Sequence, residues 1–109
     1  MTTKVVYILH RRKGTTRQEM NEAWRAQLAL IASYPGLTKW VHNYVISPEG
    51  DDAACDGYGE HYFESEEALW ATVNSTELAD AVEDAKTYLD MDKTKMIVVR
   101  TETIFDRDT

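Results

Sequence analysis

The pattern of hydrophobic and polar residues predicts four strands and two helical regions in this chain of 109 residues. Short runs rich in β-branched and aromatic residues, bounded by glycine, proline or charged clusters, are typical of strands. Two longer stretches repeat their apolar residues every three or four positions, which is the spacing of amphipathic helices. The predicted order is strand, helix, strand, strand, helix, strand. The strands are expected at 5–9, 37–46, 56–65 and 96–99.

The first helical region begins with a capping box, in which Thr16 and Glu19 satisfy the free amides of the first turn. It is expected to end near Ser33, before a Pro-Gly pair that stops helices. One apolar stripe runs along it, and Gln27 is the single amide in that stripe. We therefore expect Gln27 to face whatever the helix covers. The stripe consists of Met20, Trp24, Gln27, Ile31 and Tyr34, with Ala23, Leu28 and Leu30 beside it.

The second helical region starts at Ser65, a preferred N-cap residue, with two glutamates that suit the helix dipole. The polar run 74–76 is expected to interrupt it. A further helical stretch then places Leu78, Val82, Ala85 and Leu89 on one face. Between the second and third strands, residues 47–52 read as a polar turn.

This order of elements is that of the split β-α-β arrangement, a ferredoxin-like α+β fold with a four-stranded antiparallel sheet and helices on one face. The length fits one domain, residues 1–109. The strands at 5–9 and 96–99 are apolar on both sides, although helices cover only one face of such a sheet. Leaving these side chains in water would cost ~1.5–3 kcal/mol each. We therefore predict a homodimer that packs sheet against sheet.

The third strand carries the most unusual pattern. Counting by twos, Tyr58, Glu60 and Tyr62 share one face, and His61 shares the other with Gly59 and Phe63. In a central strand both ionisable groups would be partly desolvated, which shifts pKa values and favours chemistry. Gly59 is expected to leave a space next to the imidazole of His61. The plainer interpretation, hydrogen-bonded polar groups inside a sheet or an interface, is equally open.

Composition excludes several function classes. The net charge of −7 disfavours both a nucleic-acid partner and an anionic membrane surface. A single cysteine, Cys55, suits a reducing compartment, and no apolar run is long enough for a signal peptide or a membrane span, so a cytoplasmic location is expected. The three histidines lack metal-ligand spacing, so no metal site is predicted. The absence of a phosphate-binding glycine loop or dinucleotide fingerprint favours cofactor-free chemistry.

The chain resembles the EthD-domain family of the dimeric α/β-barrel superfamily over nearly its whole length. The matching features are the helix carrying Trp24, the Pro-Gly-Leu sequence that opens the second strand at 35–37, and the Glu-x-x-Phe-x-Ser sequence at 60–65. The resemblance implies an eight-stranded barrel shared by two copies, with a pocket between helices and sheet in each. Many family members carry a histidine on the first helix, but here the matching positions hold Gln27 or Leu28.

A more distant resemblance is to muconolactone methylisomerase, which has a reactive cysteine at the position of His61 and an aromatic residue at that of Trp40. The resemblance implies that His61, Trp40 and His42 lie on the pocket face, whereas Glu60 faces the barrel. Because His61 replaces the cysteine, thiol chemistry at this position is excluded.

Proton transfer by histidine is the chemistry these residues favour most, because histidine titrates near neutral pH. We identify His61 and His42 as candidate catalytic residues, and Gln27, Trp40, Trp24 and Tyr7 as candidate substrate-binding residues. The tryptophans are also typical core residues. Three functions stay open: a cofactor-independent lyase or isomerase acting on a small, mainly apolar, oxygenated ring compound, a non-catalytic binding protein for such a compound, and a cofactor-free monooxygenase.

Overall fold

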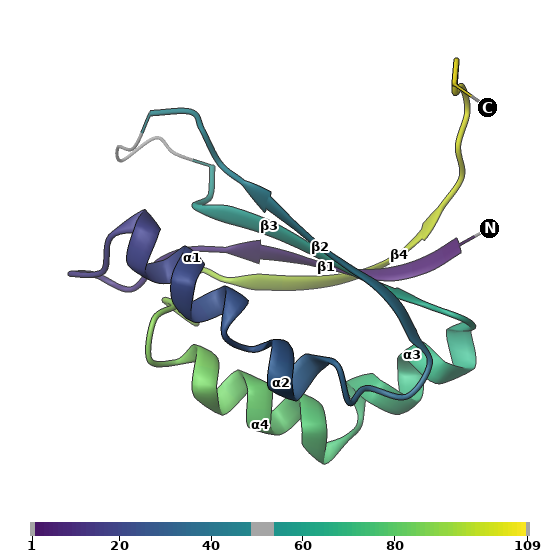
Figure 1. Cartoon of the computed structure of the whole chain (residues 1–109), viewed down its shortest axis with the longest axis horizontal. Coiled ribbons are helices and arrows are strands. Elements are labelled where there is room, and N and C mark those ends of the chain that lie inside the picture. Colours follow the sequence, from purple (N-terminus) through teal and green to yellow (C-terminus); the bar gives the residue numbers. More distant parts are fainter. Residues whose placement is uncertain (1, 49–53, 109) are drawn as a thin grey trace.

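The computed structural model of the chain describes residues 2–48 and 54–108, so most of the predicted turn at 47–52 lies outside the described residues. Within them, the predicted α+β ferredoxin-like fold is confirmed: four antiparallel strands form one sheet in the order β2-β3-β1-β4, and the helices lie on one side of it (Figure 1). The elements are β1 Thr2–Leu9, α1 Arg17–Arg25, α2 Leu28–Ile31, β2 Leu37–Tyr44, β3 Gly57–Phe63, α3 Glu66–Val73, α4 Thr76–Ala85 and β4 Lys95–Thr101.

The first helical region is divided, whereas the sequence predicted one helix to about Ser33. The backbone N–H of Gln27 donates to the carbonyl of Trp24, and that of Leu30 donates to Gln27, both across three residues instead of four. These tighter bonds form a short turn between α1 and α2. The predicted apolar stripe still forms one buried face on both sides of the turn, because all five of its residues are at most 7% exposed. Its predicted flank does not: Leu28 is 58% exposed, since the turn directs it to solvent.

The predicted cap at Ser65 and the predicted interruption at 74–76 are both present in the second helical region. Ser65 accepts a hydrogen bond from the backbone N–H of Ala68, and Ser75 accepts one from that of Leu78. Each serine therefore starts a new helix, α3 or α4, by satisfying a free amide of the first turn. Of the predicted apolar face, Leu78, Ala85 and Leu89 are buried and Val82 is half-buried, and Ala81 of α4 is buried beside them.

The register of the sheet separates its two faces. In the central pair, Val5 lies opposite His61, and His61 lies opposite Trp40 on β2. These residues face the helices. The alternate residues face away from them, among them Glu60, which accepts a hydrogen bond from the Lys4 ammonium at 2.6 Å. The predicted alternation of β3 is therefore confirmed, with His61 on the helix face and Glu60 on the outer face.

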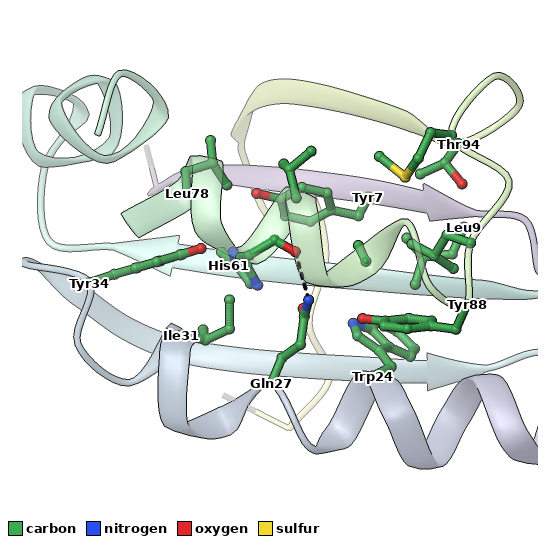
Figure 2. Close-up of a pocket in the computed structure, with 15 residues that line it drawn as sticks. Tyr7, Leu9, Trp24, Gln27, Ile31, Tyr34, His61, Leu78, Tyr88 and Thr94 are labelled. Atoms are coloured by element: carbon green, nitrogen blue, oxygen red, sulfur yellow. Dashed lines mark hydrogen bonds between the residues drawn. The ribbon is translucent and has the colours of Figure 1, made fainter. Parts of the chain in front are cut away.

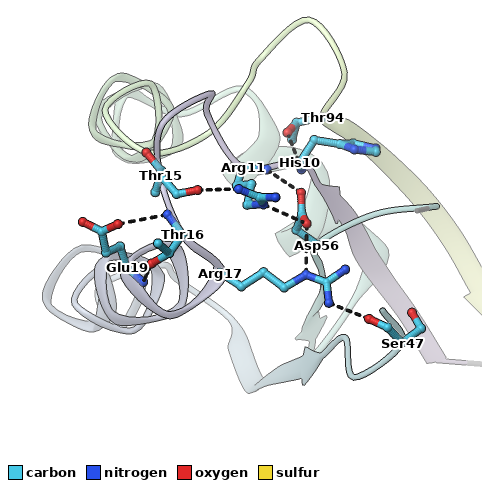
Figure 3. Close-up of polar contacts among 9 residues, drawn as sticks. All are labelled: His10, Arg11, Thr15, Thr16, Arg17, Glu19, Ser47, Asp56 and Thr94. Atoms are coloured by element: carbon cyan, nitrogen blue, oxygen red, sulfur yellow. Dashed lines mark hydrogen bonds and ion pairs between the residues drawn. The ribbon is translucent and has the colours of Figure 1, made fainter. Parts of the chain in front are cut away.

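A charged cluster joins the start of α1 to the segment before β3 (Figure 3). Asp56 accepts hydrogen bonds from the backbone N–H of Arg11 at 2.9 Å and from Nε of Arg17 at 3.1 Å. Arg17 also donates to the carbonyl of Ser47 at 2.6 Å. Burial alone would raise the pKa of Asp56, but the hydrogen bonds and charges of both arginines hold it below its ordinary value. The cluster thus fixes the end of α1 that precedes Met20 and Trp24.

Candidate ligand-binding cavity

A mainly apolar cavity lies between the helix face of the sheet and the helices (Figure 2). It has a volume of about 60 Å³, measured as the space open to the centre of a water molecule. One water needs ~10–15 Å³ on this measure, so the cavity has room for a small ring compound but not for a large one. The residues that line it are Tyr7, Leu9, Trp24, Gln27, Ile31, Tyr34, His61, Leu78, Ala81, Val82, Ala85, Tyr88, Leu89, Met91 and Thr94.

His61 is the central polar group of this cavity. Its side chain projects from the middle of β3 and contacts two tyrosine rings, Tyr7 at 4.7 Å and Tyr34 at 6.0 Å between ring centroids. It is 5% exposed, and its Nδ1 atom has no hydrogen-bond partner among the described residues. Burial, with a smaller contribution from the charge of His42, lowers the pKa of His61 to about 3. The imidazole is therefore neutral at pH 7.

Three tyrosines surround the same space, and two of their hydroxyl groups are buried without a hydrogen-bond partner among the described residues, those of Tyr34 and Tyr88. Figure 2 shows the Tyr34 hydroxyl pointing toward His61. Burial raises the pKa of Tyr34 to about 12 and that of Tyr7 and Tyr88 further. All three phenols are thus protonated at neutral pH, and each keeps an O–H group that can donate to a ligand.

Trp24 occupies the space that the sequence analysis expected beside His61. A Cβ atom placed on Gly59 would lie 2.6 Å from Cζ2 of Trp24, closer than any real contact. The prediction of an empty space at Gly59 was therefore wrong, because the indole of α1 packs directly on this glycine. The indole also stacks on His42, the residue paired with Gly59 on β2, with ring centroids 3.4 Å apart and planes 8° apart. Trp24 forms a wall of the cavity.

His42 and Trp40 lie outside the cavity, behind that wall. They share an open surface groove with Arg25, Leu28 and Tyr44. Burial, followed by the charge of Arg25, lowers the pKa of His42 to about 4. Trp40 stands between the two imidazoles, with its ring centroid 4.4 Å from that of His42 and 5.8 Å from that of His61. The structure therefore places both histidines on the predicted face but does not bring them into one cavity.

Gln27 lines the cavity, and both hydrogens of its amide are already used. Its Nε2 atom donates to the carbonyl of Ala81 at 2.9 Å and to the Asp84 carboxylate at 3.1 Å. Both acceptors belong to α4, so Gln27 ties the turn between α1 and α2 to that helix. As a candidate substrate-binding residue it can therefore offer a ligand its amide oxygen, which is an acceptor.

Sequence reasoning missed Tyr88 as a cavity residue. The helical spacing could have indicated it, because Tyr88 lies three residues after Ala85 and next to Leu89, at the end of the apolar stripe of α4. Tyr34 was recognised as part of the helical stripe but not as a polar group of the site. Among the described residues, no group of three histidine, cysteine or carboxylate side chains is placed to hold a metal ion. No helix within those residues is long and apolar enough to cross a membrane.

No protein-family model and no curated protein matches the sequence. Solved structures do match the fold. An ethyl tert-butyl ether D (EthD) family protein from Bacillus halodurans has a TM-score of 0.75 at 16% identity, over 94% of this chain and 100% of its own. A dimeric ferredoxin-like protein of unknown function from Thermobifida fusca has a TM-score of 0.69 at 12% identity, over 93% and 92%.

A third match is SnoaB, a cofactor-independent oxygenase from Streptomyces nogalater, with a TM-score of 0.65 at 8% identity over 94% of each chain. Identities this low are informative about the fold alone. They agree with the resemblance found in the sequence: the chain has the ferredoxin-like fold of these structures, which include an EthD family protein and a dimeric ferredoxin-like protein.

Proposed function

We propose that this protein is a cofactor-independent lyase or isomerase that binds a small, neutral, mainly apolar oxygenated ring compound in the cavity beside His61. One observation carries the proposal: within the part of the chain that the structure describes, His61, Tyr34 and Tyr88 each keep a buried polar atom without a hydrogen-bond partner around one apolar cavity. Leaving such an atom unsatisfied costs ~1–3 kcal/mol. A ligand with oxygen atoms at these positions recovers that cost, which makes ligand binding the simplest role for the arrangement.

The proposed chemistry is proton transfer by His61. The neutral imidazole removes a proton from the carbon next to a substrate carbonyl, and the electron pair of that C–H bond forms an enolate. The resting pKa of about 3 makes His61 a weak base, but the negative enolate beside it raises that pKa as the proton moves. The Tyr34 hydroxyl, which points toward His61, stabilises the enolate oxygen by donating a hydrogen bond. Return of the proton to another carbon isomerises the substrate, and loss of a neighbouring hydroxyl as water completes a dehydration.

Two other functions have an observation in their favour. The low pKa of His61 and the position of His42 outside the cavity favour a protein that binds and delivers the compound without converting it. The fold shared with SnoaB, which is named as a cofactor-independent oxygenase, favours a cofactor-free monooxygenase. Oxygen consumption during turnover separates the monooxygenase from the lyase or isomerase.

Replacing His61 tests the proposed chemistry. We expect His61→Gln to reduce turnover of a ring substrate by ~10²–10⁴-fold while the dissociation constant changes little, because glutamine cannot transfer the proton. Steady-state kinetics and ligand titration of the same preparation measure both quantities. His10→Gln, outside the cavity, serves as the control and should leave both unchanged. Unchanged turnover in His61→Gln would contradict the proposed chemistry, and loss of affinity alone would favour the binding protein.

We also propose that the protein works as a homodimer through the outer face of its sheet. The helices cover the other face (Figure 1), and the outer face combines the half-buried Val41 with Ile97, which is 44% exposed. At its centre the Lys4–Glu60 ion pair is nearly buried, with side chains 12% and 13% exposed. The hydrogen bond from Lys4 lowers the pKa of Glu60. A second copy would cover these apolar side chains, which is how single-layer sheets are completed.

Placing a charge on this face should break the dimer. We expect Ile97→Asp to raise the dimer dissociation constant by at least ~100-fold, since a two-fold interface buries the unpaired carboxylate twice. Light scattering coupled to size exclusion measures the mass over a dilution series. Ile46→Asp is the matched control, because Ile46 is 96% exposed and lies beyond the end of β2. A wild-type protein of monomer mass at high concentration would disprove the homodimer.

A further inference from the structure

We propose, building on the function above, that the substrate is a single uncharged ring with oxygen functions on two opposite sides, one held by the Tyr34 hydroxyl beside His61 and the other by the Tyr88 hydroxyl. Three features of the cavity carry this inference: the positions of its unpartnered polar atoms, the absence of charge in its lining and its size.

The unpartnered polar atoms lie at two separate ends of the cavity. Tyr34 belongs to an apolar cluster with Ile31 and Leu78, and its ring contacts His61. Tyr88 belongs to a different cluster, with Leu9 and Trp24. Figure 2 shows the same separation, with Tyr34 and His61 toward one end and Tyr88 beside Trp24 toward the other. A ligand with a single oxygen therefore satisfies one end and leaves the other unpaired.

The lining selects an uncharged ligand. Among the described residues that line the cavity, none is an acid, a lysine or an arginine. Beyond the lining, α4 carries Glu77, Asp80 and Asp84, and their charges help to keep the phenols of Tyr34 and Tyr88 protonated. A carboxylate or phosphate ligand would give up its hydration in an apolar space that holds no positive side chain, with these negative groups on the neighbouring helix. An ammonium ligand would find no carboxylate within the cavity to pair with.

The size and walls of the cavity favour one ring. A volume of about 60 Å³ corresponds to roughly four to six water-sized positions. The flat face of Trp24 and the small side chains of Ala81 and Ala85 bound this space. The oxygens at the two ends each find a tyrosine O–H, which donates most simply to a carbonyl. A cyclic diketone or its enol tautomer meets all three requirements.

Paired ketones test the inference directly. Isothermal titration would compare 1,4-cyclohexanedione, with oxygens on opposite sides, with cyclohexanone and with the anion cyclohexanecarboxylate. We expect the diketone to bind about 2–10-fold more tightly than cyclohexanone, the gain typical of one hydrogen bond. The carboxylate should not bind measurably. Tyr88→Phe should remove the preference for the diketone, whereas Tyr58→Phe, on the outer face of the sheet, should keep it.

The outcomes distinguish this inference from the proposed function. Equal affinity for the two ketones in the wild-type protein, or a preference that survives Tyr88→Phe, would overturn the second oxygen site. Carboxylate binding as tight as that of the ketones would overturn the requirement for an uncharged ligand. Either result leaves small-molecule binding itself intact. The proposed function fails separately, if a broad set of neutral ring compounds leaves the melting temperature unchanged.

Discussion

Lowering the pH from 7 to 5 is expected to destabilise the folded protein by about 2 kcal/mol through His61 alone. The unfolded chain takes up a proton at this histidine near pH 6.5, whereas burial holds the folded pKa at about 3. Between these two values the unfolded state binds more protons, so stability rises with pH by about 1.4 kcal/mol per unit. The stability that the neutral His61 gives the folded state is complete above pH 6.5 and is lost as the pH falls toward 3. His42, whose pKa is also lowered, acts in the same direction.

Urea unfolding at half-unit steps between pH 7 and pH 5 measures this slope. The hydrogen bonds of the folded protein lower the pKa of Asp56 and of Glu60, which keeps these two carboxylates ionised in the native state across this window. We expect His61→Gln to be less stable than the wild type at pH 7 but to lose about 2 kcal/mol less on acidification. The same slope in His61→Gln as in the wild type would mean that the buried imidazole is not the group responsible.

Removing the indole of Trp24 should have the largest effect of any single substitution in the cavity wall. The side chain is 5% exposed, packs on Gly59 and stacks on His42. We expect Trp24→Ala to destabilise the fold by about 3–5 kcal/mol, which is a large share of the ~5–15 kcal/mol typical of one domain. The substitution also removes the wall between the cavity and the groove that contains His42. The pKa of both imidazoles should then rise, because water reaches them.

Trp70→Ala provides the matched control for this substitution. Trp70 lies on α3 and is 44% exposed. Its truncation should lower the free energy of unfolding by about 1 kcal/mol or less. Denaturant midpoints give the two stabilities, and histidine proton resonances followed by NMR over a pH range report the two pKa values. Equal losses of stability in Trp24→Ala and Trp70→Ala would show that the Trp24 indole is not part of a well-packed wall.

The fold could be predicted from the sequence because its signals are local and agree with each other. Thr16, Ser65 and Ser75 cap the helices that their sequence context indicated. Alternation along β3 also put His61 and Glu60 on opposite faces of the sheet. The resemblance to muconolactone methylisomerase, not the alternation, implied that His61 is the one that faces the helices, as it does. The catalytic role of His61 stays a prediction.

What could not be predicted depends on contacts between elements far apart in the chain. The occupation of the space at Gly59 by Trp24 requires the position of α1 over β3, which no local pattern encodes. The separation of His42 from His61 depends likewise on the packing of two indoles, Trp24 stacked on His42 and Trp40 between the two imidazoles. The turn at Gln27 is stabilised by its hydrogen bonds to α4, more than fifty residues later, so the first helix could not be divided correctly from its own residues.

The ion pair on the outer sheet face has a consequence for how the chain can change. In a symmetric pair of copies every substitution appears in both, so reversing the charge of Lys4 or Glu60 introduces two repulsions at once. Only a second charge reversal in the same chain, at the other residue of the pair, would restore the attraction. These two positions are therefore expected to vary together rather than independently.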